Sequence, residues 1–265
     1  MNTKTDTEVW YLSLGLVVFG VTASILQTYV SAPYGKFSST HRSWGPSISP
    51  KLGWLLMESP AFYVSAAVFF TQSDPAHRYN TVNLLLLSLF IFYYLVRSLV
   101  YPLLMTSKQP MPIVVMFSAW FFCAYNGYLQ GIYLAKYSTT ESLTTTDTTS
   151  TLTTLRLTIG TLLFFVGWYI NQASDHQLRS LKKHSDGYKI PQGGMFQYVS
   201  AANYLGEIIE WCGYAVASWS IPALAFAVFT ALQLGRRGLS YHQWYQQKFK
   251  EEYPKDRKAI IPFIL

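Results

Sequence analysis

The chain has 265 residues, of which 51% are hydrophobic, 17% aromatic and only 12% charged. Soluble domains carry about 25% charged residues, so this composition excludes an ordinary soluble protein, and it equally excludes disorder or a coiled coil. The net charge of +7 does not indicate nucleic-acid binding, because the basic residues gather beside apolar segments without any nucleic-acid-binding motif. Cys123 and Cys212 both lie in apolar runs and predict no disulfide framework. The sequence therefore predicts an all-α integral membrane protein.

Seven apolar segments are long enough to cross a bilayer, which takes about 20 residues of helix. We expect spans at 9–30, 52–72, 81–104, 111–135, 152–172, 199–217 and 219–235. Only a tight connection around Ser218–Pro222 divides the last two. With the N-terminus outside, 15 Lys and Arg residues fall in inside segments and four in outside segments. This asymmetry predicts an outside (lumenal) N-terminus and a cytosolic C-terminus for a single domain over residues 1–265.

Between the fourth and fifth segments, residues 138–154 form a low-complexity Ser/Thr tract. Such a tract can bury almost nothing, so we expect a solvated loop on the outside. No internal repeat is visible, which argues against a transporter built from duplicated halves.

Ionisable side chains in the second and third segments mark candidate sites, because a charge within a span is costly unless it is paired or faces a cavity. Glu58 stands a few residues inside the second segment, just before Pro60. The alternative is an interfacial glutamate near a helix start. Tyr94, Arg97 and Tyr101 are spaced three and four apart and share one helical face. Arg97 either belongs to a site or pairs with an acid for packing.

Two polar stripes follow in the fifth and sixth segments. The first consists of Asn171, Asp175, Arg179 and Lys182. A solvated amphipathic extension of the fifth segment would look similar. The second consists of Asn203, Glu207, Glu210 and Trp211. Two carboxylates and an amide in a membrane helix are too costly for packing alone, so we expect them to meet cations, proton donors or a polar ligand.

After Ser240 the chain mixes aromatic and charged residues, and its apolar end, 260–265, is expected to fold back onto protein. Four basic residues either line the inner mouth of the bundle, where they would hold phosphates, or are only the positive-inside signal. They are Arg236, Arg237, Arg257 and Lys258. The sequence lacks GxGxxG, GxxxxGK[ST], HExxH and CxxC motifs, so neither common nucleotide-binding motif is present and metal catalysis has little support.

Long runs of the sequence resemble the steroid 5α-reductases (3-oxo-5α-steroid 4-dehydrogenases). They are APYGKF at 32–37, WLLMESP at 54–60, NGYLQG at 126–131, YKIPQGGMFQYVSAAN at 188–203, NYLGEIIEWCGYAVASWSIPALAFAVFTALQLG at 203–235 and HQWYQQKFKEEYPKDRKAIIPFIL at 242–265. The resemblance implies a seven-helix membrane reductase that binds NADPH on the cytosolic side. Such an enzyme transfers hydride to the β carbon of a Δ4-3-ketosteroid enone.

The resemblance also implies roles for individual residues. Glu58 and Tyr94 match the pair that polarises the C3 carbonyl, where hydrogen bonds to the developing enolate would stabilise it. The positions that match the cofactor cavity are Arg97, Asn171, Asp175, Arg179, Lys182, Tyr188, Lys189, Asn203, Arg237 and Tyr245. Those that match the surroundings of the steroid are Tyr34, Trp54, Tyr101, Glu207 and Trp211. No metal is implied, and we expect a monomer in the endoplasmic reticulum or a bacterial inner membrane.

The chain departs from the family pattern at several of these places. Met57 stands where many animal members have Gln, which removes one possible hydrogen-bond donor to the ketone. Lys182 and Lys189 stand where some members have Arg, so they keep the charge without the bidentate fork. Tyr241 replaces a common His near the cofactor mouth.

Other functions stay open at this point. Within enzymes, a reductase of another enone or of an unsaturated lipid is the nearest alternative, and a membrane methyltransferase using S-adenosylmethionine is a weaker one. From a different class, a transporter or a non-catalytic sterol carrier would also bury polar side chains around a cavity.

Overall fold

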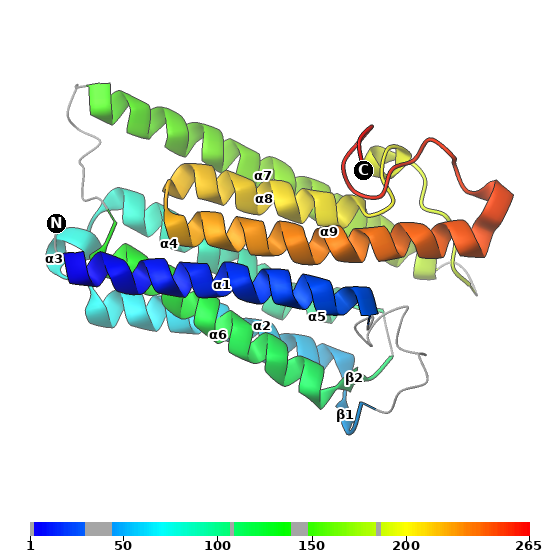
Figure 1. Ribbon diagram of the computed structural model, residues 1–265, viewed down its shortest axis with the longest axis horizontal. Coiled ribbons are helices and arrows are strands. Elements are labelled where there is room, and N and C mark those ends of the chain that lie inside the picture. The colour runs from blue at the N-terminus through cyan, green and yellow to red at the C-terminus, as the bar shows by residue number, and fades with distance from the viewer. Residues whose placement is uncertain (1–2, 30–43, 107–108, 139–147, 184–186) are drawn as a thin grey trace. The chain divides into compact units, whose positions relative to one another are not determined.

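The computed structural model describes residues 3–29, 44–106, 109–138, 148–183 and 187–265 (Figure 1). A helix occupies each of the seven expected segments. The helices are α1 (Thr3–Tyr29), α2 (Pro50–Gln72), α4 (Thr81–Leu95) with its continuations η2 (Val96–Val100) and α5 (Tyr101–Leu104), α6 (Ile113–Lys136), α7 (Thr148–Lys183), α8 (Ala202–Ser218) and α9 (Ile221–Phe249). The all-α fold is thereby confirmed.

Within the described residues, four helical segments are long and apolar enough to cross a membrane. They are Thr7–Tyr29, Pro50–Gln72, Thr81–Leu104 and Thr151–Lys182. The count of seven spans and the orientation stay predictions. The expected division of the last two segments is present, because α8 ends at Ser218 and α9 begins at Ile221. Between them Trp219 takes a left-handed backbone conformation, with φ of 51°, which turns the chain within two residues.

The described chain forms two compact units. Unit 1 comprises residues 1–16, 30–154 and 220–222, and unit 2 comprises 17–29, 155–219 and 223–265. The predicted single domain is not tested by this division. The position of Tyr34 and residues 139–147 of the Ser/Thr tract fall outside the described residues. For residues 148–154 the expectation of a loop is wrong, because they form the first turns of α7.

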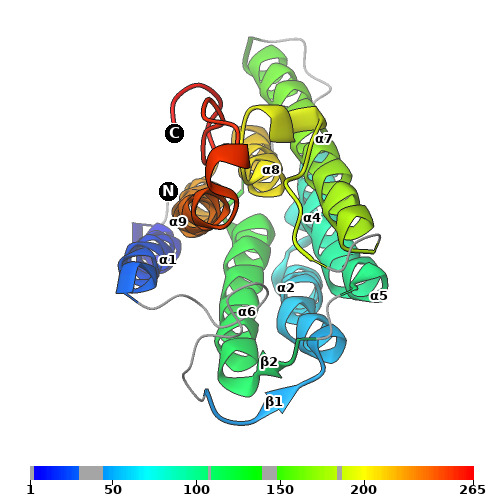
Figure 2. The same ribbon diagram turned by 90° about the vertical axis from the view of Figure 1, so that its right-hand side faces the viewer.

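In unit 1, α2 and α6 lie backbone to backbone. A Cβ atom on Gly127 would stand 2.7 Å from the carbonyl oxygen of Ala61, and one on Gly131 would stand 2.7 Å from that of Ser65. Only glycine permits so close an approach. At one end of this pair, β1 (Ser47–Ile48) and β2 (Met111–Pro112) form a short antiparallel ladder that joins the starts of both helices (Figure 2).

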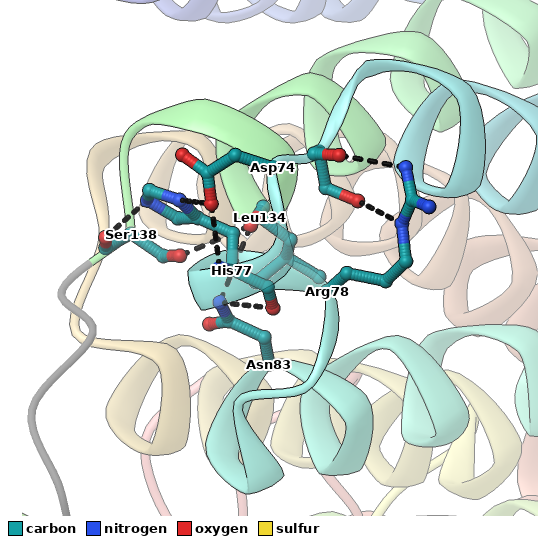
Figure 3. Close-up of polar contacts among 7 residues, drawn as sticks. Asp74, His77, Arg78, Asn83, Leu134 and Ser138 are labelled. Atoms are coloured by element: carbon teal, nitrogen blue, oxygen red, sulfur yellow. Dashed lines mark hydrogen bonds and ion pairs between the residues drawn. The ribbon is translucent and has the colours of Figure 1, made fainter.

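A polar cluster closes the connection between α2 and α4 in unit 1 (Figure 3). Asp74 caps the short helix α3 (Pro75–Arg78) by accepting from the backbone N–H of His77 at 2.9 Å, and this bond lowers the pKa of the carboxyl. The side chain of Asn83 donates to the carbonyl oxygens of His77, at 3.2 Å, and of Leu134, at 3.3 Å. The amide therefore ties α3 and the end of α6 to the first turn of α4.

The α4 segment changes its winding before it ends. Residues Val96–Val100 form one π-helical turn, in which the N–H of Tyr101 reaches the carbonyl oxygen of Val96. Such wide turns inside α-helices are frequent at functional sites. Arg97 lies within this turn.

In unit 2, α7 and α8 lie backbone to backbone over more than two turns, along what we term the glycine seam, formed by Gly160, Gly167, Gly206 and Gly213. A Cβ atom on Gly167 would stand 2.2 Å from the backbone nitrogen of Glu210, and one on Gly206 would stand 2.4 Å from that of Asn171. The seven-residue spacing within each helix returns a glycine to the same face every two turns. The seam therefore sets the register of the two helices.

The end of the chain returns to the start of α8 within unit 2. Ser200 N–H donates to the carbonyl oxygen of Lys258 at 2.8 Å, and Ala201 N–H donates to that of Ala259 at 3.1 Å. Ile260, 2% exposed, joins a core cluster with residues 196–205. The expectation that the apolar end folds back onto protein is confirmed for Ile260, whereas Phe263 and Ile264 are 79% and 78% exposed.

Candidate functional site

The predicted catalytic pair meets side chains of α6 in unit 1. Tyr94 is buried near the end of α4, and its hydroxyl accepts a hydrogen bond from the Asn126 amide at 3.4 Å. The Cys123 thiol donates to a carboxyl oxygen of half-buried Glu58 at 3.7 Å. Cys123 and Asn126 are one turn apart on the same face of α6. Glu58 and Tyr94 therefore contact α6 at two neighbouring turns of that face.

Arg97 lies among aromatic rings. Its guanidinium carbon is 4.7 Å from the ring centre of Trp54 and 4.7 Å from that of Tyr101, and the two rings meet edge to face at 4.9 Å. Cation–π contact of this kind stabilises a charge that is partly removed from water. The structure thus joins Arg97, predicted for the cofactor, to two residues predicted for the steroid.

Met57, the departure from the family pattern next to Glu58, is buried in a methionine cluster with Met111 and Met116. Ile48 and Trp54 pack against the same cluster. The thioether therefore fills space at the ladder end of α2, where flexible methionine side chains adapt well to irregular gaps.

In unit 2, the two polar stripes meet where α7 passes the start of α8. The Asn171 amide donates to the backbone carbonyl of Asn203 at 2.9 Å, and the Asn203 amide donates to Asp175 at 3.0 Å. Asn171 and Asp175 are buried, at 2% and 6% exposure. A carboxylate that accepts from an amide keeps acceptor capacity for a further donor, such as a ligand hydroxyl or amide.

Further along α7, the basic residues become progressively more exposed. Arg179 is half-buried, whereas Lys182 and Lys189 are exposed. One buried guanidinium nitrogen of Arg179, Nη1, has no hydrogen-bond partner within the described residues. The same holds for Nε of half-buried Arg236 on α9. Two buried cationic donors without acceptors are what a phosphate-bearing ligand needs.

Arg237 is held by two tyrosines at the middle of α9. Its Nε donates to the Tyr204 hydroxyl at 2.9 Å and its Nη2 to the Tyr241 hydroxyl at 3.4 Å, while the guanidinium lies 5.4 Å from the Tyr241 ring. Tyr241 thus serves as an acceptor for a buried cation.

Tyr245 and Tyr188, both predicted for the cofactor, differ in exposure. Tyr245 is 4% exposed and stacks on Tyr253 at 5.6 Å, and burial raises its pKa above the usual range. Tyr188 is exposed and contacts Trp244 at 4.8 Å between ring centres, and partial burial raises its pKa. Both phenols therefore stay protonated near neutral pH and can donate hydrogen bonds.

The remaining predicted residues of α8 are buried in unit 2. Glu207 is 9% exposed. Trp211 is 1% exposed and packs on Phe226 at 4.4 Å and on Tyr214 at 5.7 Å. The structure therefore gives Trp211 a packing role, and its place beside the steroid stays a prediction.

The residues missed by sequence reasoning lie in α6. Asn126 and Gln130 belong to the NGYLQG run, yet neither was assigned a role. Both are buried, at 0% and 1% exposure. Two amides four residues apart in an apolar segment are the signal that marks them, by the same cost argument that identified Glu58.

Known proteins of one kind match this chain over nearly its whole length. The family described as "3-oxo-5-alpha-steroid 4-dehydrogenase" matches residues 109–265. A 3-oxo-5-alpha-steroid 4-dehydrogenase 1 from Bos taurus is 42% identical over 248 residues, covering 93% of both chains. A steroid 5-alpha-reductase DET2 from Gossypium hirsutum is 40% identical and covers 98% of both. The Homo sapiens 3-oxo-5-alpha-steroid 4-dehydrogenase 1 is 44% identical, covering 87% of this chain and 85% of its own.

Proposed function

Because this chain belongs to the steroid 5α-reductase (3-oxo-5α-steroid 4-dehydrogenase) family of integral membrane proteins, we propose that it reduces the C4–C5 double bond of 3-oxo-Δ4 steroids with NADPH. The observation that carries the proposal is identity of 40–44% to relatives of that activity over most of both chains. The product is the corresponding 5α-reduced 3-oxosteroid.

Glu58 and Tyr94 act on the substrate carbonyl in this proposal. When bound, NADPH supplies a hydride to C5 of the steroid, which moves an electron pair toward the C3 oxygen. The Tyr94 hydroxyl and a protonated Glu58 carboxyl donate hydrogen bonds to that oxygen and stabilise the enolate. C4 then takes a proton from solvent, which restores the ketone. The contacts of both side chains with α6 support this assignment.

The cofactor site in this proposal is built from unit 2. Asn171, Asp175 and Asn203 supply a fixed polar surface, since two hydrogen bonds hold the side chains of all three. Arg179 and Arg237 supply positive charge for phosphates, and the unused buried nitrogen of Arg179 supports this. The other residues assigned to the cofactor are Arg97, Lys182, Tyr188, Lys189 and Tyr245.

The residues assigned to the steroid are Tyr34, Trp54, Tyr101, Glu207 and Trp211. We further propose seven membrane spans, a lumenal or periplasmic N-terminus and a cytosolic C-terminus, supported by a helix at each expected segment and by the 15-to-four distribution of basic residues. We expect a monomer.

The test is turnover of NADPH with progesterone and testosterone by the purified protein in detergent or lipid, with product stereochemistry determined at C5. Glu58→Leu and Tyr94→Phe should each lower kcat by about 100-fold or more, because each removes one donor to the developing oxyanion. Tyr93→Phe is the matched control, because Tyr93 is a buried neighbour on the same helix, and it should stay near wild type.

Three other results of these assays would favour a different mechanism or function. A 5α product with little loss in either variant would keep the reductase and remove the proposed acid pair. NADPH binding without steroid turnover would favour a lipid-enone reductase. No NADPH binding would favour a sterol carrier.

A further inference from the structure

Three buried polar side chains lie on one face of α6 in unit 1, and we term them the α6 stripe: Cys123, Asn126 and Gln130. They are spaced three and four residues apart, and their exposure is 2%, 0% and 1%. The contacts of Gly127 and Gly131 pack α6 closely against α2. Because the three side chains are buried there, water does not compete for their hydrogen bonds. Each polar atom here must therefore find its partner in the protein.

The hydrogen bonds of the stripe fix the orientation of both amides. Gln130 Nε2 lies 3.1 Å from the carbonyl oxygen of Pro222 and 3.2 Å from Asn126 Oδ1. The Pro222 carbonyl can only accept, so Gln130 must turn its NH2 group toward it. The same NH2 group of Gln130 also donates to Asn126 Oδ1. If the Asn126 amide were flipped, its NH2 group would face the NH2 group of Gln130, and two donors cannot bond to each other. Asn126 must therefore direct its own NH2 group at Tyr94.

This orientation decides where the Tyr94 proton points. The phenolic oxygen accepts from Asn126 Nδ2 at 3.4 Å, so the single hydroxyl proton is directed away from α6. Donation into the oxygen also makes the O–H a stronger donor, because neighbouring hydrogen bonds polarise one another. Neither Asn126 nor Gln130 needs to touch the substrate to have this effect.

We propose that Asn126 is a positioning residue for the reductase reaction, which aims the Tyr94 hydroxyl at the steroid carbonyl, and that Gln130 fixes Asn126 in the orientation this requires. The proposal rests on the proposed function of Tyr94. Cys123 completes the stripe by donating to Glu58, so α6 supports both members of the catalytic pair.

The decisive variant is Asn126→Asp, which has the same shape and still accepts from Gln130 but loses the donor to Tyr94. We expect kcat to fall about 10- to 100-fold at pH 8, the usual effect of losing one hydrogen bond to a group that carries charge. KM for NADPH and for the steroid should change less than threefold. At lower pH the introduced carboxyl group gains a proton and can donate again, so its kcat relative to wild type should rise as pH falls.

A second measurement separates positioning from stability. In a Tyr94→Phe background there is no hydroxyl to aim, so Asn126→Asp should then change kcat less than threefold. Gln130→Met, which frees Asn126 to reverse, should lower kcat by about three- to tenfold. Asn83→Asp is the matched control, since Asn83 is an equally buried amide at the other end of α4. It should lower the melting temperature without lowering kcat.

The outcomes are distinguishable. If Tyr94→Phe loses activity but Asn126→Asp stays within twofold of wild type at every pH, the positioning proposal is wrong and the proposed function stands. Equal losses from Asn126→Asp in both backgrounds would also overturn it. If Tyr94→Phe stays fully active, the catalytic assignment of Tyr94 fails, and the positioning role fails with it.

Discussion

Adding one methyl group at the glycine seam, with Gly167→Ala, should separate α7 from α8. The new Cβ atom would stand 2.2 Å from the backbone nitrogen of Glu210, whereas ordinary contacts begin near 3.4 Å, so the helices must part by about 1.2 Å. The hydrogen bond between Asn171 and Asn203, now 2.9 Å, would stretch to about 4 Å and break.

Overpacking of this kind costs about 1–3 kcal/mol. For a chain of this length that corresponds to a melting temperature roughly 3–10 °C lower. The assay is thermal unfolding of the purified protein in detergent, with and without NADPH. Because the broken bond holds the proposed cofactor surface, the stabilisation by a fixed NADPH concentration should also shrink.

Gly235→Ala is the control, because it should raise the stability that Gly167→Ala lowers. Gly235 lies within α9, and apart from the backbone of α9 itself no atom of the described residues lies within 4 Å of an added Cβ, so alanine should stabilise the helix by about 0.5–1 kcal/mol. If Gly167→Ala melts at or above the temperature of Gly235→Ala, the seam does not hold the helices as described.

Three further predictions concern other parts of the chain. Burial and the charges of Arg257 and Lys258 lower the pKa of His242, so the folded state resists protonation of this side chain. The contribution of His242 to stability should therefore be full above about pH 6.5 and should fall as the pH drops below that value. His242→Gln should reduce the difference in melting temperature between pH 7.5 and pH 5.5. Asn83→Ala removes the donor to two carbonyls and should cost about 1–3 kcal/mol in thermal unfolding. Arg237→Lys should raise Kd for NADPH by at least about tenfold in a binding titration, because a lysine cannot reach both tyrosine hydroxyls and an anion; an unchanged Kd would remove Arg237 from the cofactor site.

The helices were predictable because their signal is composition over about 20 residues. Every expected segment carries a helix, and the expected break at Ser218–Pro222 lies where α8 gives way to α9. The π-helical turn at Val96–Val100 was not predicted, although Pro102 stands two residues beyond it. Proline lacks the N–H that would bond to the carbonyl of Ser98, and this disturbs the preceding helical turn.

The candidate site was predictable where polar side chains interrupt an apolar helix. This criterion found Glu58, Asn171 and Asp175, and the structure brings the last two together with Asn203. The same criterion applied to α6 would have found Asn126, which was overlooked because no charged side chain stands near it in that segment. The glycine seam was missed for a different reason: its four glycines are informative only when α7 and α8 are already paired.

The β1–β2 ladder has a consequence for how the chain is made. Ile48 and Met111 are partners in the ladder but lie about 60 residues apart in sequence. At roughly 5–20 residues per second, a ribosome needs on the order of 3–12 s to synthesise that interval. During this delay α2 must reside in the membrane with Glu58 before Cys123 has been translated. The helix that carries the proposed acid therefore enters the bilayer on its own hydropathy, and α6 arrives later to complete its surroundings.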